Sequence, residues 1–114
     1  MKRSYIIKTS EDIDKVFKKK QSVGDYCFAI YKIEHEYSHF KYSISIGKKY
    51  GNAVERNLAK RRIRDIINRF SEKLNSKMSF VIVVKPSVSQ LSFEKMNLSI
   101  EKLLKKSELL KKED

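Results

Sequence analysis

Residues that can bind anions are concentrated between Gly47 and Arg69 of this 114-residue sequence. Eight Lys or Arg stand there against two acidic residues, so the stretch carries +6, half of the chain's net charge of +12. Guanidinium groups bind phosphate through paired hydrogen bonds, and ammonium groups add point charges. Positive charge concentrated in about a fifth of the chain predicts a polyanionic partner.

Most of this stretch has the periodicity of an amphipathic helix. Counted at about 100° per residue from Arg56, its apolar residues form one stripe and its basic and amide residues an adjoining face. Like charges four residues apart, such as Arg56 and Lys60, each cost about 0.2–0.5 kcal/mol. Stability alone does not favour them, so we interpret the face as a binding surface rather than an ordinary solvated one. The stripe is Ala59, Ile63, Ile66, Ile67, Phe70 and Leu74, and the face is Arg56, Asn57, Lys60, Arg61, Arg64 and Asn68.

A basic loop with two glycines, residues 47–54, precedes this helix. Glycine lets backbone approach a ligand closely, and the free N–H groups of a helix N-terminus attract anions. The loop lacks the GxxxxGK[ST] pattern, so it does not predict nucleotide hydrolysis. It is either an anion-binding turn or a solvated connection.

Other chemistries have little support in the sequence. The acidic residues are scattered among predicted caps and turns, so they do not form the carboxylate cluster of a two-metal nuclease. His35 and His39 are four residues apart in a predicted turn rather than on a helix, which makes them poor candidates for metal ligands. Cys27 is the single cysteine and is interpreted as a small buried residue. We expect no catalytic residue, and no metal or cofactor bound by the chain itself.

Length and composition predict one intracellular, cytoplasmic domain over residues 1–114, with residues 105–114 as a partly ordered tail. No stretch has the length of a signal peptide or of a membrane span. A pI of about 9.8 leaves nucleic acid or an anionic membrane surface as the partner. The narrow, β-branched stripe suits a helix that packs on a sheet, so nucleic acid is favoured over a membrane.

Hydrophobic patterns predict an α+β protein with the element order α-β-β-α-β-α. Two runs joined by a polar turn are expected to form an antiparallel hairpin, and a Val-rich run without alternation is expected to be a central strand. The hairpin's second strand, the basic helix and the Val-rich strand would form a βαβ crossover in a mixed sheet. The predicted elements are a helix at 10–20, a loop at 22–25, strands at 27–33, 41–46 and 79–84, and a last helix that directs Phe93, Met96, Ile100, Leu103 and Leu104 inward.

Aromatic residues have two possible roles. Phe28 is assigned to the core. For Phe17 and Tyr31 the sequence favours two roles equally: packing in the core, or forming a surface on which unpaired RNA bases stack.

The run from Lys48 to Arg64, KKYGNAVERNLAKRRIR, resembles the Arg-Asn-Arg signature of the bacterial ribonuclease P protein subunit, K-K-x-G-x-A-V-x-R-N-x-x-K-R-x-x-R. The opening Asp12-x-x-Lys15-Val16-Phe17 also resembles that family, as do the length and the element order. The resemblance implies an α/β sandwich similar to the second domain of ribosomal protein S5, with a left-handed crossover where the general rule gives a right-handed one.

The resemblance also implies a function. The chain would be the protein subunit of a ribonucleoprotein that removes the 5′ leader from precursor tRNA, while the RNA subunit carries the catalytic magnesium ions. We expect a monomer in a 1:1 complex with ribonuclease P RNA, and neither DNA nor a membrane as a partner. The resemblance would place Lys48, Lys49, Arg56, Asn57, Lys60, Arg61 and Arg64 near the RNA subunit.

The leader, by the same resemblance, would lie in a cleft between the first helix and the sheet. Two positions depart from the family: Ile13 stands where a second aromatic is frequent, and Gly47 stands where Ser is usual. The first puts stacking at that position in question, although apolar contact is retained. The residues implied for leader binding are Ile13, Phe17, Tyr31, Lys48 and Asn52.

Two other classes stay open at this point. A ribosome-associated or general RNA-binding module would bind structured RNA without preferring a precursor tRNA that carries a leader. A protein-only nuclease would cleave RNA without an RNA cofactor, and the scattered carboxylates disfavour it.

Overall fold

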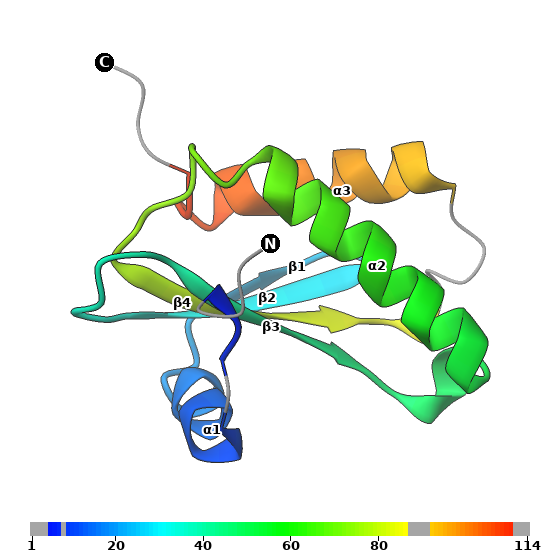
Figure 1. Cartoon of the computed structure of the whole chain (residues 1–114), viewed down its shortest axis with the longest axis horizontal. Helices are drawn as coiled ribbons and strands as arrows, with labels where there is room; N and C mark the ends of the chain where they lie inside the picture. Colours follow the sequence, from blue (N-terminus) through cyan, green and yellow to red (C-terminus); the bar gives the residue numbers. More distant parts are fainter. Residues whose placement is uncertain (1–4, 8, 87–91, 111–114) are drawn as a thin grey trace.

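In the described part of the chain, a four-stranded mixed sheet carries α1 on one face and α2 and α3 on the other (Figure 1). The computed structural model describes residues 5–7, 9–86 and 92–110. In chain order the elements are α1 (Ser10–Lys18), β1 (Ser22–Gly24), β2 (Phe28–Glu34), β3 (Lys41–Ile46), the 3-10 helix η2 (Lys48–Tyr50), α2 (Ala53–Arg69), β4 (Met78–Val84) and α3 (Phe93–Lys106).

The last strand of the chain, β4, lies between β2 and β3 in the order β1-β2-β4-β3. It pairs antiparallel with β2 and parallel with β3. The predicted hairpin of residues 27–33 and 41–46 is therefore wrong, because the two strands form but do not pair with each other. Alternation of apolar residues specifies which face of a strand is buried and not which neighbour it takes. The predicted central position of the Val-rich strand is confirmed.

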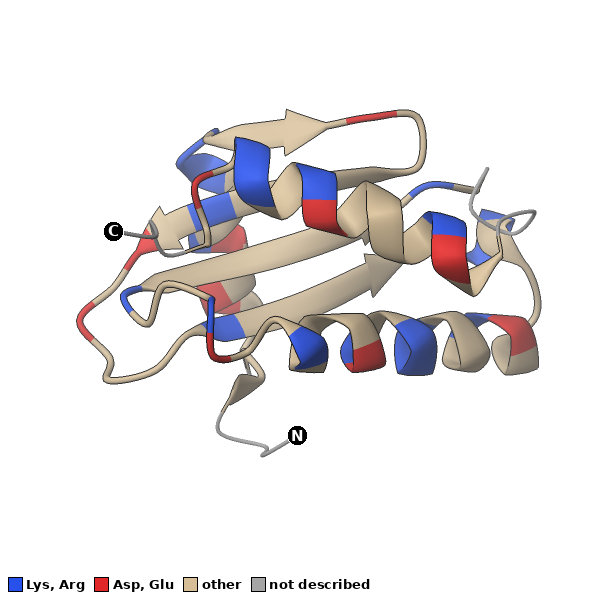
Figure 2. Ribbon diagram, turned by 90° about the horizontal axis from the view of Figure 1, so that it is seen from above, with Lys and Arg blue, Asp and Glu red and all other residues tan. Residues whose placement is uncertain are grey.

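The predicted βαβ crossover is present, since β3 and β4 are parallel neighbours joined through α2. Figures 1 and 2 show β3 at the near edge of the sheet and α2 above it. Viewed with α2 in front and the strands pointing upward, the chain moves to the left from β3 to β4. The crossover is left-handed, as the family resemblance implies and against the general rule.

The main core lies between the sheet and the helix pair α2 and α3. Phe28, Ile30, Phe80 and Ile82 point to this side and are fully buried. The predicted stripe of α2 is confirmed, because all its members are buried except Phe70, which is half-buried. The last helix likewise buries Met96, Ile100, Leu103 and Leu104, while Phe93 is half-buried.

The opposite face of the sheet carries α1. The helix begins after Thr9, whose hydroxyl accepts a hydrogen bond from the Asp12 N–H at 3.2 Å. Val16 is buried in a small cluster with Ile7 and Val81. The helix ends at Lys18, two residues earlier than predicted, and Lys20 has a left-handed φ of 58° that cannot continue it.

At the margins of the fold, one segment differs from its prediction, and the structure describes part of the predicted tail. The predicted loop at residues 22–25 contains β1, whose three residues are too few to show alternation. The tail is ordered at least to Leu110: Leu109 is buried, its carbonyl accepts from Asn75 N–H at 2.7 Å, and Leu110 bridges to Leu74. Two adjacent leucines can pack, which the surrounding lysines obscured. Residues 111–114 lie outside the described ranges.

Within the described ranges, no helix is both long enough and apolar enough to cross a membrane.

Candidate nucleic-acid interface

The start of α2 is fixed by a capping box between Asn52 and Glu55. The Asn52 side-chain oxygen accepts from Glu55 N–H at 2.9 Å, and Glu55 Oε1 accepts from Asn52 N–H at 3.1 Å. The helix therefore begins at Ala53, three residues before the predicted start at Arg56. A Cβ added at Gly51 would lie 2.9 Å from the Glu55 carboxylate, so this glycine leaves room for the cap.

The basic loop before α2 forms the 3-10 turn η2, with Tyr50 N–H donating to Gly47 O at 3.1 Å. Lys48 and Lys49 lie on this turn and are exposed. Arg56 reaches back, and its Nη1 donates to Gly51 O at 3.2 Å. This contact ties the loop to the helix, so Arg56 has a structural role in addition to the predicted contact with RNA.

The predicted binding face of α2 is open to solvent. Asn57, Arg61 and Arg64 are exposed, and Lys60 is half-buried. Among the described residues only two ion pairs form, Lys15–Asp12 and Lys105–Glu101, and neither involves α2. Figure 2 shows basic residues spaced along this helix. Within the described ranges, no carboxylate therefore pairs with the cations of this face, which leaves them free to bind phosphate.

Two further arginines of α2 contact the protein itself. Arg69 lies over the ring of Phe93, with its guanidinium carbon 5.0 Å from the ring centroid. Arg62 is half-buried and close enough to Tyr50 to oppose the rise in the pKa of that phenol, which burial causes. These contacts separate Arg62 and Arg69 from the exposed binding face.

A cavity of about 180 Å³ adjoins the binding face, between α2 and the edge strand β3. Lys60 and Arg64 line it together with the buried Tyr42. Burial raises the pKa of Tyr42 to about 12, and the positive charge of Arg64 opposes that rise. The Tyr42 hydroxyl has no hydrogen-bond partner in the part of the chain that the structure describes.

On the other face of the sheet, α1 brings together the apolar and aromatic residues predicted for leader binding. Phe17 and Tyr31 meet edge to face, with ring centroids 4.8 Å apart. Both are half-buried, as is Ile13, and all three pack against the buried Val16 cluster. Each of the three side chains packs against the core on one side and is open to solvent on the other. They can therefore belong to the core and still contact a ligand.

A strip of sheet continues from this aromatic pair toward the loop before α2. Cross-strand register places Ser43 in the row of Tyr31, and Ala29, Val83 and Ser45 in the next row. None is fully buried, and Figure 1 shows that α1 covers only part of this face. We call Ala29, Ser43, Ser45 and Val83 the floor strip. Sequence reasoning did not assign these residues to the site, although the alternation within residues 41–46 puts Ser43 and Ser45 on the polar side of that strand.

Lys48 and Asn52 are not beside the aromatic pair. Lys48 lies five residues beyond Ser43, a separation on the order of 15 Å along an extended strand. The Asn52 side-chain oxygen is already engaged by the helix cap. Of the residues predicted for leader binding, Ile13, Phe17 and Tyr31 therefore lie together, whereas Lys48 and Asn52 follow the end of β3 in the chain.

A further polar network stabilises the fold without facing either surface. Asp25 accepts hydrogen bonds from the N–H groups of Cys27 and Phe28, each at 2.8 Å, and from Ser99 Oγ at 2.5 Å. Burial opposes the charged carboxylate, but these hydrogen bonds and Lys85 hold the pKa of Asp25 below its usual value. The network fastens the turn between β1 and β2 to α3.

The two histidines point to protein oxygens. His35 contacts Ser79 Oγ and Ser76 O, and His39 Nδ1 lies 3.1 Å from Phe40 O. In the described ranges, His, Cys, Asp and Glu do not gather in threes or more as a metal site would require.

An exposed basic helix and an aromatic-bearing sheet face on this α+β scaffold define an RNA-binding protein. The model of the Ribonuclease P family matches residues 1–108. The ribonuclease P protein component of Acholeplasma laidlawii is 54% identical over 113 residues, 99% of this chain and 97% of that protein. That of Enterococcus faecalis is 34% identical, over 96% of this chain and 94% of its own length.

Solved structures agree with these relatives. The RNase P protein of Staphylococcus aureus superposes with a TM-score of 0.88 at 29% identity, covering 93% of this chain and 97% of that one. The chain belongs to the ribonuclease P protein family, whose members are the protein component of ribonuclease P.

Proposed function

We propose that the chain binds the RNA subunit of ribonuclease P through α2 and the loop before it, and the 5′ leader of precursor tRNA along the floor strip. The complex would contain one protein per RNA subunit and act in the cytoplasm. The observation that carries the proposal is the row of exposed cations on α2, which pair with no carboxylate of the described residues, in a chain that the family model matches over residues 1–108.

The contact with the RNA subunit is supported by the exposure of the cations on α2 and the loop before it. Lys48, Lys49, Arg61 and Arg64 are exposed on one continuous segment, so each can reach a phosphate without breaking an intramolecular ion pair. Asn57 adds an amide that can bond a phosphate or sugar oxygen. Backbone contacts of this kind position an RNA without reading its sequence.

The contact with the leader is supported by the opposite face. The edge-to-face pair of Phe17 and Tyr31 presents aromatic surface on which an unpaired base can stack, and Ile13 adds apolar contact. The serines of the floor strip can bond sugars and phosphates, and Lys48 and Asn52 stand at its far end. One leader several nucleotides long could then touch both groups.

The chemical step is assigned to the RNA subunit and its magnesium ions. The protein brings two polyanions together by supplying positive charge on both sheet faces, which lowers their repulsion. Cleavage should therefore need less magnesium when the protein is present.

The proposal is tested by cleavage of precursor tRNA with a bacterial ribonuclease P RNA at low magnesium, with and without this chain. We expect accurate 5′ cleavage only when both are present. Cleavage by the protein alone would identify a protein-only nuclease. RNA binding without any gain in cleavage would identify a general RNA-binding module instead.

The leader contact has its own test within the same assay. A precursor tRNA with a long leader should bind the complex more tightly than mature tRNA, and Phe17→Ala should reduce that difference. Phe93→Ala is the matched control, because Phe93 is also half-buried but lies on the opposite face of the sheet.

A further inference from the structure

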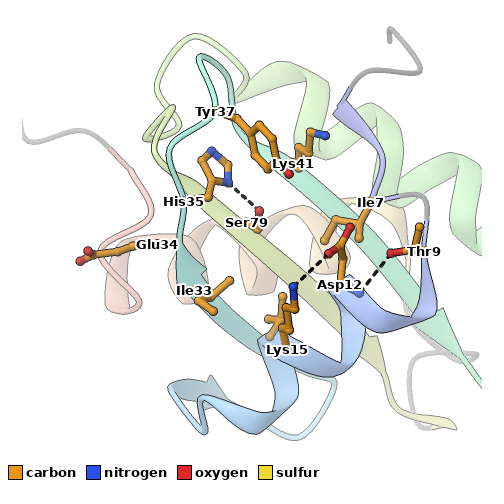
Figure 3. Close-up of a pocket in the computed structure, with 11 residues that line it drawn as sticks. Ile7, Thr9, Asp12, Lys15, Ile33, Glu34, His35, Tyr37, Lys41 and Ser79 are labelled. Carbon is orange, nitrogen blue, oxygen red and sulfur yellow. Dashed lines mark hydrogen bonds and ion pairs between the residues drawn. The ribbon is translucent and has the colours of Figure 1, made fainter.

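A pocket lies on the α1 face of the sheet, beside α1 (Figure 3). Val16 packs over the row of Val81, so α1 divides this face. The row of Ile33, Ser79 and Lys41 lies on one side of α1, and the row of Val83 on the other. The pocket on the Ser79 side encloses about 360 Å³, within the range of about 300–1,000 Å³ that holds small molecules.

The bottom of this pocket is apolar. Ile7 and Val16 are buried and Ile33 is half-buried, and all three line the pocket. Tyr37 forms part of the wall, with its ring 5.0 Å from the His35 ring in an edge-to-face arrangement. The side chain of Tyr37 is 53% exposed. A flat ring resting on the isoleucines would therefore also contact an aromatic wall.

Two groups of the pocket lining, the Ser79 hydroxyl and the Asp12 carboxylate, can accept hydrogen bonds from a bound base. The Ser76 carbonyl can only accept, so His35 Nε2, 2.8 Å away, donates to it. In the tautomer with this single ring N–H, His35 Nδ1 accepts from Ser79 Oγ at 2.6 Å. The Ser79 hydroxyl then donates its hydrogen bond to His35 and keeps lone pairs that can accept. The Asp12 carboxylate, which is more exposed, provides further acceptor atoms at the rim. The other carboxylate of the lining, Glu34, points away from the centre (Figure 3).

The rim of the pocket is cationic. Lys15 Nζ lies 3.9 Å from Asp12 Oδ1, and both side chains are more than half exposed. Lys41 Nζ lies 4.1 Å above the Tyr37 ring. These two ammonium groups stand on either side of the opening, where a phosphate attached to a bound ring could reach them.

We propose that this pocket binds one unstacked nucleotide whose base carries N–H donors, guanine above all. The ring would rest on the isoleucines beside Tyr37, its donor edge would face Ser79 and Asp12, and its phosphate would meet Lys15 and Lys41. Guanine presents an N1–H and an amino group on one edge, whereas uracil presents a single N–H. Unpaired bases splayed from an RNA strand are recognised in this manner.

The site is separate from the leader contact under Proposed function. The floor strip and the pocket are on opposite sides of α1, so one can be occupied without the other. The base could belong to a free nucleotide or to an RNA strand, because the chemistry recognised is the same.

The test is a titration of the full chain followed by amide NMR shifts. We expect GMP to shift residues around Ile33 and Ser79, UMP to bind at least several-fold more weakly, and inorganic phosphate to leave this region unchanged. A single-stranded RNA with one guanosine among uridines should shift the same amides. If only the RNA shifts the amides of the pocket, the site binds a base within a strand. If GMP shifts them as well, a single nucleotide is sufficient for binding.

Two matched variants locate the effect. Asp12→Asn should weaken GMP or oligonucleotide binding about tenfold, the usual effect of losing a hydrogen bond to a charged group. Asp14→Asn removes the same charge from an exposed position of α1 that does not line the pocket, and should change binding little.

The proposal is overturned if the two variants bind alike, if GMP and UMP bind alike, or if neither GMP nor the RNA shifts the pocket. Equal shifts with inorganic phosphate would reduce the site to a simple anion site. Cleavage of precursor tRNA is measured in parallel: normal cleavage by Asp12→Asn would leave the proposed function standing whatever the pocket does.

Discussion

Arg61 and Arg62 are neighbours in sequence but differ in their surroundings. Arg61 is exposed, whereas Arg62 is half-buried beside Tyr50. We predict that Arg61→Ala weakens binding of the RNA subunit roughly tenfold, by loss of a charge-assisted hydrogen bond, and lowers the salt slope of binding by about 1. Its unfolding free energy should change by less than about 0.5 kcal/mol. Filter binding across a salt series measures the affinity and its salt slope, and denaturant unfolding measures the stability.

Lys102→Ala is the control for Arg61, because Lys102 is exposed on α3, away from the proposed interface. It should leave both affinity and slope near the unmodified values. Equal losses in the two variants would show that overall charge, rather than the α2 face, governs binding.

Tyr42 is a residue whose ionisation is linked to folding. Its folded pKa of about 12 lies above the ordinary value of 10.0, so the folded protein keeps a proton that the unfolded chain loses. Deprotonation of Tyr42 in the unfolded chain therefore lowers the free energy of unfolding. Stability is unaffected below pH 10 and falls as the pH rises toward 12. The loss amounts to about 2 to 3 kcal/mol. Urea unfolding at pH 8 to 11 should show the start of the decline.

Tyr42→Phe isolates this effect from the titration of lysines and other tyrosines. Because the Tyr42 hydroxyl is buried without a partner among the described residues, the variant should be as stable at pH 8 or more stable by about 1 kcal/mol. Its advantage should then grow with pH. A variant less stable at pH 8 would mean that the hydroxyl makes a favourable contact in solution.

Among the elements, local patterns predicted helices and strands well, but the partners of the strands could not be predicted. The stripe of α2 and the inward face of α3 follow from a 3.6-residue period that the residues themselves carry. The pairing of β2 and β3 with β4 depends on segments more than 30 residues apart in sequence, and alternation does not encode it.

The candidate site divides in the same way. The exposed face of α2 lies within one continuous segment, so the periodicity of that segment predicted it. The floor strip and the pocket beneath α1 combine residues from three strands and a helix, so they require the sheet order before they can be seen. Phe17 and Tyr31 are in contact in the structure, and their role with the leader stays a prediction.

The segment after α3 shows how an element can be missed among charges. Leu109 is 1% exposed. We predict that Leu109→Ala lowers the unfolding free energy by about 2 to 4 kcal/mol, by loss of apolar contact and creation of a cavity. Leu98→Ala is the control, since Leu98 is 65% exposed on α3 and should change stability by less than about 0.5 kcal/mol. Equal effects in urea unfolding would contradict the packed position of Leu109.

At the scale of the whole molecule, the net charge is +12, and half of it lies between Gly47 and Arg69. If about 5 to 8 phosphates are neutralised on binding the RNA subunit, the logarithm of affinity should fall with the logarithm of salt at a slope of about −4 to −7. Measurements from 50 to 400 mM salt (roughly the useful range) test this. A slope near −1 would mean that nonionic contacts dominate the interface.

The position of β4 also determines when the sheet can assemble as the chain leaves the ribosome. Strand β3 has its parallel neighbour only once Met78–Val84 has emerged, and β2 can meet only the short β1 before then. The basic helix α2 is synthesised in the interval, before the strand that completes its support exists. A nascent chain halted before Met78 would thus present a cationic segment without its folded scaffold, next to ribosomal RNA. The topology therefore makes closure of the sheet depend on the last strand to be synthesised.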